Sequence, residues 1–89
     1  MICIQLSFNE SQARLDARPA HRDRLAALHA EGRLLAAGPW SDDSGALIVL
    51  TTGEAEAREI MAADPFYSTP GVTVAAVREW NPVVGPAPV

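Results

Sequence analysis

The sequence predicts one α+β domain whose elements follow the order strand, helix, strand, strand, helix, strand. Three observations predict this class. Apolar and polar residues alternate at the start of the chain, two later segments carry apolar residues at helical spacing, and glycine or proline separates the segments. The chain has 89 residues, 48% hydrophobic and 20% charged, which is typical of one globular domain.

The first third of the chain predicts a strand and a helix. Residues 2–8 alternate between large apolar side chains and smaller or polar ones, which indicates a half-buried strand. Residues 9–17 are polar and mixed, and we expect a loop or irregular turn. A helix is predicted from about residue 18, with Asp16 as its cap and Pro19 in its first turn, to Glu31, before Gly32.

Two strands are predicted next, joined by a tight loop over residues 41–45. Residues 33–40 form the first of these strands, which ends or bulges at Pro39 because proline cannot donate to a ladder. Residues 46–51 are apolar without alternation, so this strand is expected to be covered on both faces.

The last part of the chain predicts a helix, a strand and a tail. The second helix covers about 54–63, because a proline at position 65 biases the preceding residue away from helical geometry. The last strand covers 72–80. We expect a domain over residues 1–82, followed by a proline-rich tail over 83–89 that is either flexible or laid against a partner.

This order of elements predicts the ferredoxin-like arrangement, a four-stranded antiparallel sheet with both helices on one face. The other face of the sheet then has no cover, although the strand over 46–51 is apolar on both sides. A chain of 9.5 kDa is not expected to leave that face in water. The sequence therefore predicts a homodimer that packs sheet to sheet.

Composition excludes several classes of function. The net charge is −4 and all seven basic residues are arginines, which argues against a nucleic-acid partner or an anionic membrane. Cys3, the single cysteine, is expected to be a small buried residue, and the two histidines and Cys3 lack metal-ligand spacing. We expect no metal and no cofactor. Without a signal peptide, transit peptide or long apolar run, a cytoplasmic protein is the expectation.

Helical spacing places one histidine and one aspartate on inward faces. His21 shares the apolar face of the first helix with two leucines, and Asp64 follows the apolar positions of the second. An aspartate is unexpected there, because a helix C-terminus carries partial negative charge. His21 is either a hydrogen-bonded core histidine or an acid–base group. Asp64 is either the cap of an Asp-Pro turn or the partner of His21.

The expected direction of the helices leaves their contact open. We expect the two helices to run roughly parallel, because two antiparallel strands join them. The start of the first helix and the end of the second would then lie at opposite ends of the sheet. On spacing alone, a bond between His21 and Asp64 requires the Asp64 segment to bend back.

Five segments together resemble the YCII-related, or YciI-like, family: RPAH (18–21), GRLLAAGPW (32–40), GALIVL (45–50), AADPF (62–66) and VREWNP (77–82). The resemblance covers nearly the whole chain in order. It implies a dimeric α+β barrel with ferredoxin-like subunits, with a higher oligomer left open. It also implies a His–Asp pair in a cleft, at the positions of His21 and Asp64, and it therefore favours contact between them.

The matching motifs make five further residues the expected ligand contacts: Arg18, Gly38, Pro39, Pro65 and Phe66. Gly38 is expected in the cleft wall, because a side chain there would crowd a ligand beside His21. A carboxylate fixes the tautomer of an imidazole and makes it a general acid or base. The resemblance thus favours a small-molecule enzyme of lyase, isomerase or dehalogenase type. The alternative is a non-catalytic module that binds a small ligand or a protein.

Overall fold

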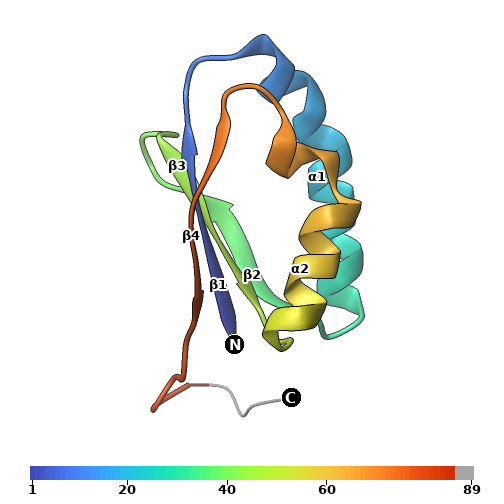
Figure 1. Cartoon of the computed structure of the whole chain (residues 1–89), viewed down its shortest axis with the longest axis vertical. Helices are drawn as coiled ribbons and strands as arrows, with labels where there is room; N and C mark the ends of the chain where they lie inside the picture. Colours follow the sequence, from blue (N-terminus) through green and yellow to red (C-terminus); the bar gives the residue numbers. More distant parts are fainter. Residues whose placement is uncertain (86–89) are drawn as a thin grey trace.

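A computed structural model describes residues 1–85 as an antiparallel sheet with two helices on one face (Figure 1). The strand order is β2-β3-β1-β4, which confirms the ferredoxin-like βαββαβ fold. Of the predicted tail over 83–89, residues 86–89 lie outside the described part. The elements are β1 (Ile2–Phe8), α1 (Gln12–Ala30), β2 (Leu34–Pro39), β3 (Gly45–Leu50), α2 (Glu54–Ala63), the 3-10 helix η1 (Pro65–Ser68) and β4 (Val72–Glu79).

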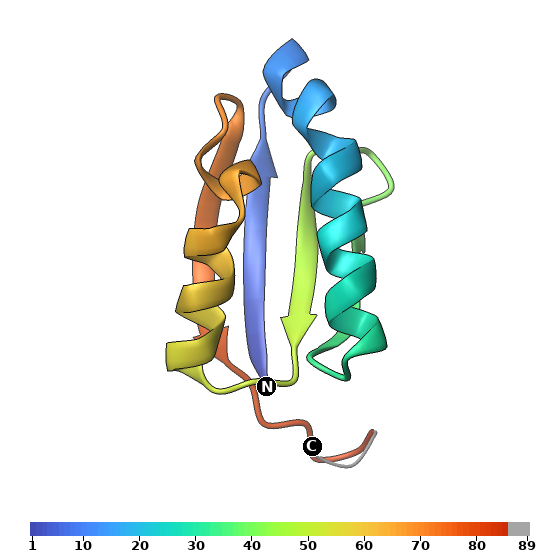
Figure 2. The same cartoon turned by 90° about the vertical axis from the view of Figure 1, so that its right-hand side faces the viewer.

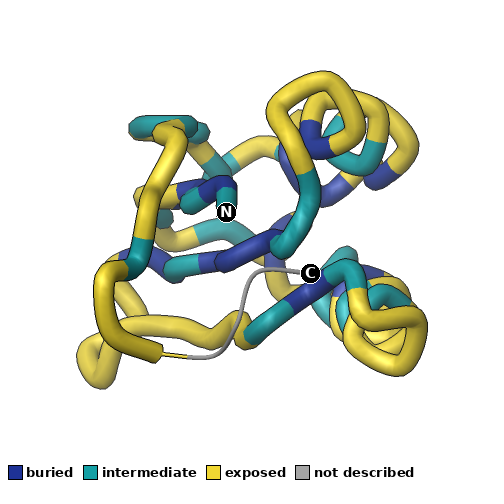
Figure 3. The backbone as a smooth tube through the Cα atoms, turned by 90° about the horizontal axis from the view of Figure 1, so that it is seen from below, coloured by how far each residue is buried: buried dark blue, intermediate teal, exposed yellow. Residues whose placement is uncertain are grey.

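The hydrophobic core is built from residues of β1, β2, β3, α2 and η1, and Figure 3 marks the buried stretches of the backbone. Ile4 of β1 pairs with Ile48 of β3, and both side chains are almost fully buried on the helix-covered face. Burial of each such side chain contributes about 1.5–3 kcal/mol to the free energy of unfolding. The alternate residues of β1, such as Gln5, point to the face that carries no helix, which confirms the predicted alternation.

Helix α1 begins six residues before the predicted start, so the loop expected over 9–17 is correct for residues 9–11 and wrong for 12–17. Ser11, not Asp16, is the cap, and its hydroxyl accepts a hydrogen bond from the backbone N–H of Arg14 at 3.2 Å. The same hydroxyl donates to the carbonyl of Pro70 at 2.7 Å. Pro19 therefore lies inside the helix, not in its first turn. The predicted C-terminus is close to the observed one, and Gly32 follows it with a φ of 76°.

The two helices run in opposite directions (Figure 2), and the expected parallel arrangement is wrong. Each helix runs back along the strand that precedes it. Because β1 and β3 are antiparallel neighbours, α1 and α2 are antiparallel as well. The first half of α1 therefore lies beside the end of α2, at the same end of the sheet. This direction brings His21 and Asp64 together without any reversal of the chain.

Gly45 and Gly38 form a matched pair of substitution sites in this sheet. A Cβ at Gly45 would overlap the backbone carbonyl of Leu6 in β1, whereas a Cβ at Gly38 meets nothing within 4 Å. We expect Gly45→Ala to lower the free energy of unfolding by about 1–3 kcal/mol. Gly38→Ala should leave it unchanged or raise it by up to about 1 kcal/mol. Urea unfolding of both variants checks this, and equal stabilities would contradict the close packing of β1 on β3.

Candidate functional site

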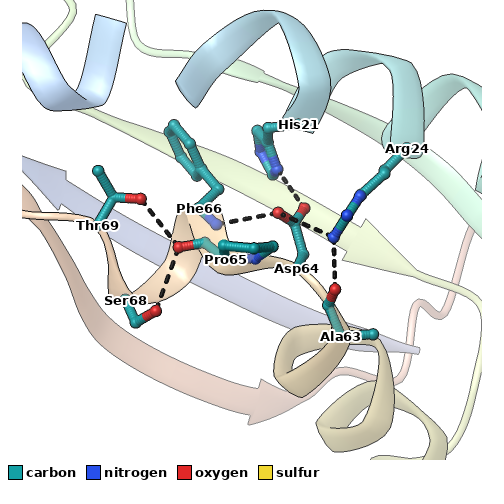
Figure 4. A network of polar contacts seen from close by, with 8 residues as sticks. All are labelled: His21, Arg24, Ala63, Asp64, Pro65, Phe66, Ser68 and Thr69. Carbon is teal, nitrogen blue, oxygen red and sulfur yellow. Dashed lines mark hydrogen bonds and ion pairs between the residues drawn. The ribbon is translucent and has the colours of Figure 1, made fainter. Parts of the chain in front are cut away.

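The centre of the site is a bond between the two helical segments (Figure 4). Nδ1 of His21, on α1, lies 2.7 Å from Oδ2 of Asp64, at the end of α2. Both side chains are buried, with 7% and 9% of their surface exposed. A carboxylate only accepts hydrogen bonds, so Nδ1 carries the proton and Nε2 is the ring nitrogen left for another partner. Both residues thus face inward, as helical spacing predicted.

Asp64 has three partners, which explains how an aspartate is tolerated at a helix C-terminus. Besides His21, its Oδ1 accepts the backbone N–H of Phe66 at 3.0 Å and so caps η1. The guanidinium of Arg24 lies 3.7 Å from the same oxygen and donates to the carbonyl of Ala63, the last residue of α2. The two interpretations of Asp64 are therefore both correct, because one carboxylate caps the turn and holds the histidine.

Aromatic rings hold the imidazole in place. The ring of Phe66 stacks on that of His21, with centroids 4.0 Å apart and planes 8° apart. Tyr67 meets His21 edge-on, with centroids 5.5 Å apart. The Asp64 bond and the Phe66 stack restrict two different rotations of the side chain, so the direction of Nε2 is set before any ligand arrives.

His21 lines a cavity of about 510 Å³ between α1 and the edge strand β2. Most of its wall is apolar, from Leu25 on α1, Leu34 on β2, and both Phe8 and Phe66. A largely apolar cavity of this size, with a few placed polar groups, suits a small organic molecule.

The structure brings most, but not all, of the predicted contact residues to this cavity. Gly38, Pro39 and Phe66 line it, whereas Arg18 and Pro65 are not part of its wall. Asp64 lies behind His21 and lines a second cavity, of about 340 Å³, between the two helices. The ligand contacts of all five residues stay predictions.

Gly38 lines the cavity for a reason other than the predicted one. It is paired with Leu47, whose other partner is the outward-facing Gln5, so position 38 belongs to the face without helices. A side chain there would point away from the cavity and would not crowd a ligand beside His21. Any ligand contact at Gly38 is therefore made by its backbone.

Arg14 is a residue of this region that sequence reasoning missed. It is buried, its guanidinium lies 4.5 Å above the ring of Phe8, and it pairs with Asp43 at 3.3 Å. Phe8 in turn meets Phe66 edge-on. A prediction that α1 begins after Ser11 would have placed Arg14 and His21, seven residues apart, on one face of the helix.

Tyr67 was also missed, and it places a buried hydroxyl group near the pair. Its side chain is buried, and within residues 1–85 its hydroxyl has no hydrogen-bond partner. Burial, and then the negative charge of Asp64, raises the pKa of the Tyr67 phenol above its ordinary range. The hydroxyl next to the pair therefore stays neutral.

Two absences hold for the part of the chain that the structure describes. No three side chains of metal-binding type come together there. Within the same residues, no helix combines the length and the apolar character needed to cross a membrane.

Comparison with known proteins matches residues 1–81 to the YCII-related domain, a span that contains every helix and strand above. The chain belongs to the YCII-related family. Two curated YCII-related relatives, the proteins called Protein YciI of Escherichia coli O6:H1 and of Shigella flexneri, are each 41% identical over 84 residues. The matched region is 89% of this chain and 86% of each relative. The family predicted from the motifs is confirmed.

Tyr67 is the single tyrosine of the chain, so its ionisation can be followed alone. We expect the phenolate absorbance of the folded protein to be absent near pH 10, where the urea-unfolded chain titrates. Because only the unfolded state then loses the proton, the free energy of unfolding should fall as the pH rises above about 10. Tyr67→Phe should remove that fall and keep stability at neutral pH. A folded protein that titrates like the unfolded chain would contradict this.

Proposed function

We propose that this chain is a small-molecule enzyme in which His21 is the general acid and base and Asp64 positions it. The observation that carries the proposal is the buried 2.7 Å bond at Nδ1, made by a histidine that also lines an apolar cavity. The reaction class is proton abstraction followed by isomerisation or elimination, with no metal or cofactor required.

The chemistry follows from the tautomer. With Nδ1–H donated to Asp64, neutral His21 offers the lone pair of Nε2 to a C–H bond of a molecule in the cavity. The imidazolium that forms is stabilised by the carboxylate behind it. Returning the proton to another carbon of the substrate completes an isomerisation. Delivering it to a departing group completes an elimination.

The packing of the pair supports this use of the ring. The Phe66 stack keeps the imidazole in one plane, and the apolar wall keeps water away from a carbanion or enolate. Placement of a base at the reacting bond is worth about 10²–10⁴ in rate.

A non-catalytic ligand-binding module is the second candidate, and one observation favours it. Asp64 already caps η1 and pairs with Arg24, which also donates to the last carbonyl of α2, so its bond to His21 also serves the fold. A structural bond of that kind needs no reaction to explain it. The two candidates differ in whether any turnover depends on the tautomer of His21.

We further propose that the chain works as a cytoplasmic homodimer that packs through the face of the sheet without helices. That face carries Leu47 and the buried Val49 on β3, beside Cys3 on β1. Trp40 and Trp80 are each 45% exposed at strand ends. Large apolar side chains in such positions are typical of an interface.

Asp64→Asn tests the pair with little change of shape. The amide can still accept the N–H of Phe66, but its NH₂ group faces Nδ1 and favours the tautomer protonated at Nε2. We expect nitrogen-15 NMR to show the ring proton of His21 move from Nδ1 to Nε2, with exposed His29 unchanged as the internal control. Turnover of enolisable lactones or chlorinated acids should fall by about 10²–10⁴.

The possible results separate the two candidates. Ring shifts of His21 that are identical in both proteins would show that Asp64 does not set the tautomer, and the enzyme proposal would fail. A shifted tautomer, together with no turnover that depends on His21, would favour the binding module.

Multi-angle light scattering tests the dimer. We expect a mass of twice the 9.5 kDa chain at micromolar concentration. Leu47→Glu should give a folded monomer, because it puts a charge on the proposed interface. The exposed substitution Glu59→Gln on α2 is the control and should stay dimeric. A wild-type chain that is monomeric under these conditions contradicts the proposal.

A further inference from the structure

The polar side chains that line the larger cavity are all basic, although the chain carries a net charge of −4. They are His21, Arg22 and His29, all on α1. Among residues 1–85, no aspartate or glutamate contributes to this wall. Within the described residues, Arg22 is thus the only lining side chain that is always charged.

These basic groups lie at two depths, because of helical spacing. Arg22 and His29 are seven residues apart, with Ala26 between them, so they share one stripe of α1. All three residues of this stripe are exposed, whereas His21 is buried. Arg22 and His29 thus flank the mouth of the cavity, and the small side chain of Ala26 leaves the space between them open.

Arg22 is free to bind a ligand. Within the described residues its guanidinium makes no ion pair and no hydrogen bond, while other arginines of the chain do: Arg14 with Asp43, Arg24 with Asp64, Arg33 with Glu31 and Glu56, and Arg58 with Glu54. A guanidinium without a carboxylate partner, at the mouth of an apolar cavity, matches the forked geometry of a carboxylate.

We propose that the cavity takes a small organic anion, an apolar body with one carboxylate, and that Arg22 binds the carboxylate at the mouth. The apolar body lies against Leu25 and Phe66, and its reacting carbon faces Nε2 of His21. This inference rests on the proposed function and names the substrate class of the same site.

The orientation of the anion in the cavity follows from the charges of Asp64 and Arg22. Asp64 lies behind His21, so a second carboxylate placed next to the pair would be repelled. At the mouth the carboxylate meets a cation and keeps part of its hydration. Because Arg22 is exposed to solvent, its effect on affinity should be moderate, about two- to fivefold.

Phenylacetate and its neutral isostere phenylacetamide test the inference directly. Each probe is titrated into the nitrogen-15-labelled protein, whether dimer or monomer. The NMR shifts of the backbone amides of Ala26 and Phe66 then give the two dissociation constants. We expect phenylacetate to bind about two- to fivefold more tightly. Arg22→Gln should abolish the difference. Arg58→Gln removes the same charge from α2, away from the cavity, and should keep it.

Each other result overturns the inference. It is overturned if the two probes bind equally or if neither binds at millimolar concentration. It is also overturned if the anion preference survives Arg22→Gln, or if Arg58→Gln abolishes that preference as well. His21→Gln separates this test from that of the proposed function. If the anion preference persists but no turnover depends on His21, only the enzyme proposal fails. If turnover depends on His21 but the preference is absent, only the anion inference fails.

Discussion

The hydrogen bond between His21 and Asp64 is the interaction on which the two helices and the site both depend. It joins residues 43 positions apart in the sequence and ties α1 to the end of α2. Asp64 is also the C-cap of α2 through its backbone, while its carboxylate caps η1 and orients the imidazole. Loss of Asp64 would leave the buried Nδ1–H of His21 without this partner, which costs about 1–3 kcal/mol. A chain that keeps this packing therefore keeps the geometry of its acid–base pair.

Sequence reasoning predicted the strands and the second helix well, because each is defined locally. Alternation set the face of β1, and Pro65 set the end of α2 at Ala63. The start of α1 failed, since its cap is a single serine in a polar stretch and Pro19 is more typical of a first turn. The direction of the helices failed for a different reason. It follows from the antiparallel pairing of β1 with β3, which is a property of the whole sheet.

The sequence likewise predicted one part of the candidate site and missed another. Helical spacing predicted that His21 and Asp64 face inward, and resemblance to the family paired them. Spacing could not predict that Arg14 is buried, because the burial depends on the ring of Phe8 and on Asp43, which come from other elements. Nor could it predict that Tyr67 lies against the pair, since its place depends on how η1 folds back under α1. The places of Arg14 and Tyr67 in the site therefore follow from tertiary packing and not from the local sequence.

His21 and Asp64 line two different cavities. His21 faces the larger, mostly apolar one, while Asp64 lines the smaller one between the helices, together with charged side chains such as Arg24 and Glu59. His21 and Asp64 thus separate the two cavities, and a ligand in the larger one meets the imidazole and not the carboxylate behind it. Changes in the wall between the helices can therefore act on the carboxylate without altering the surface that the ligand contacts.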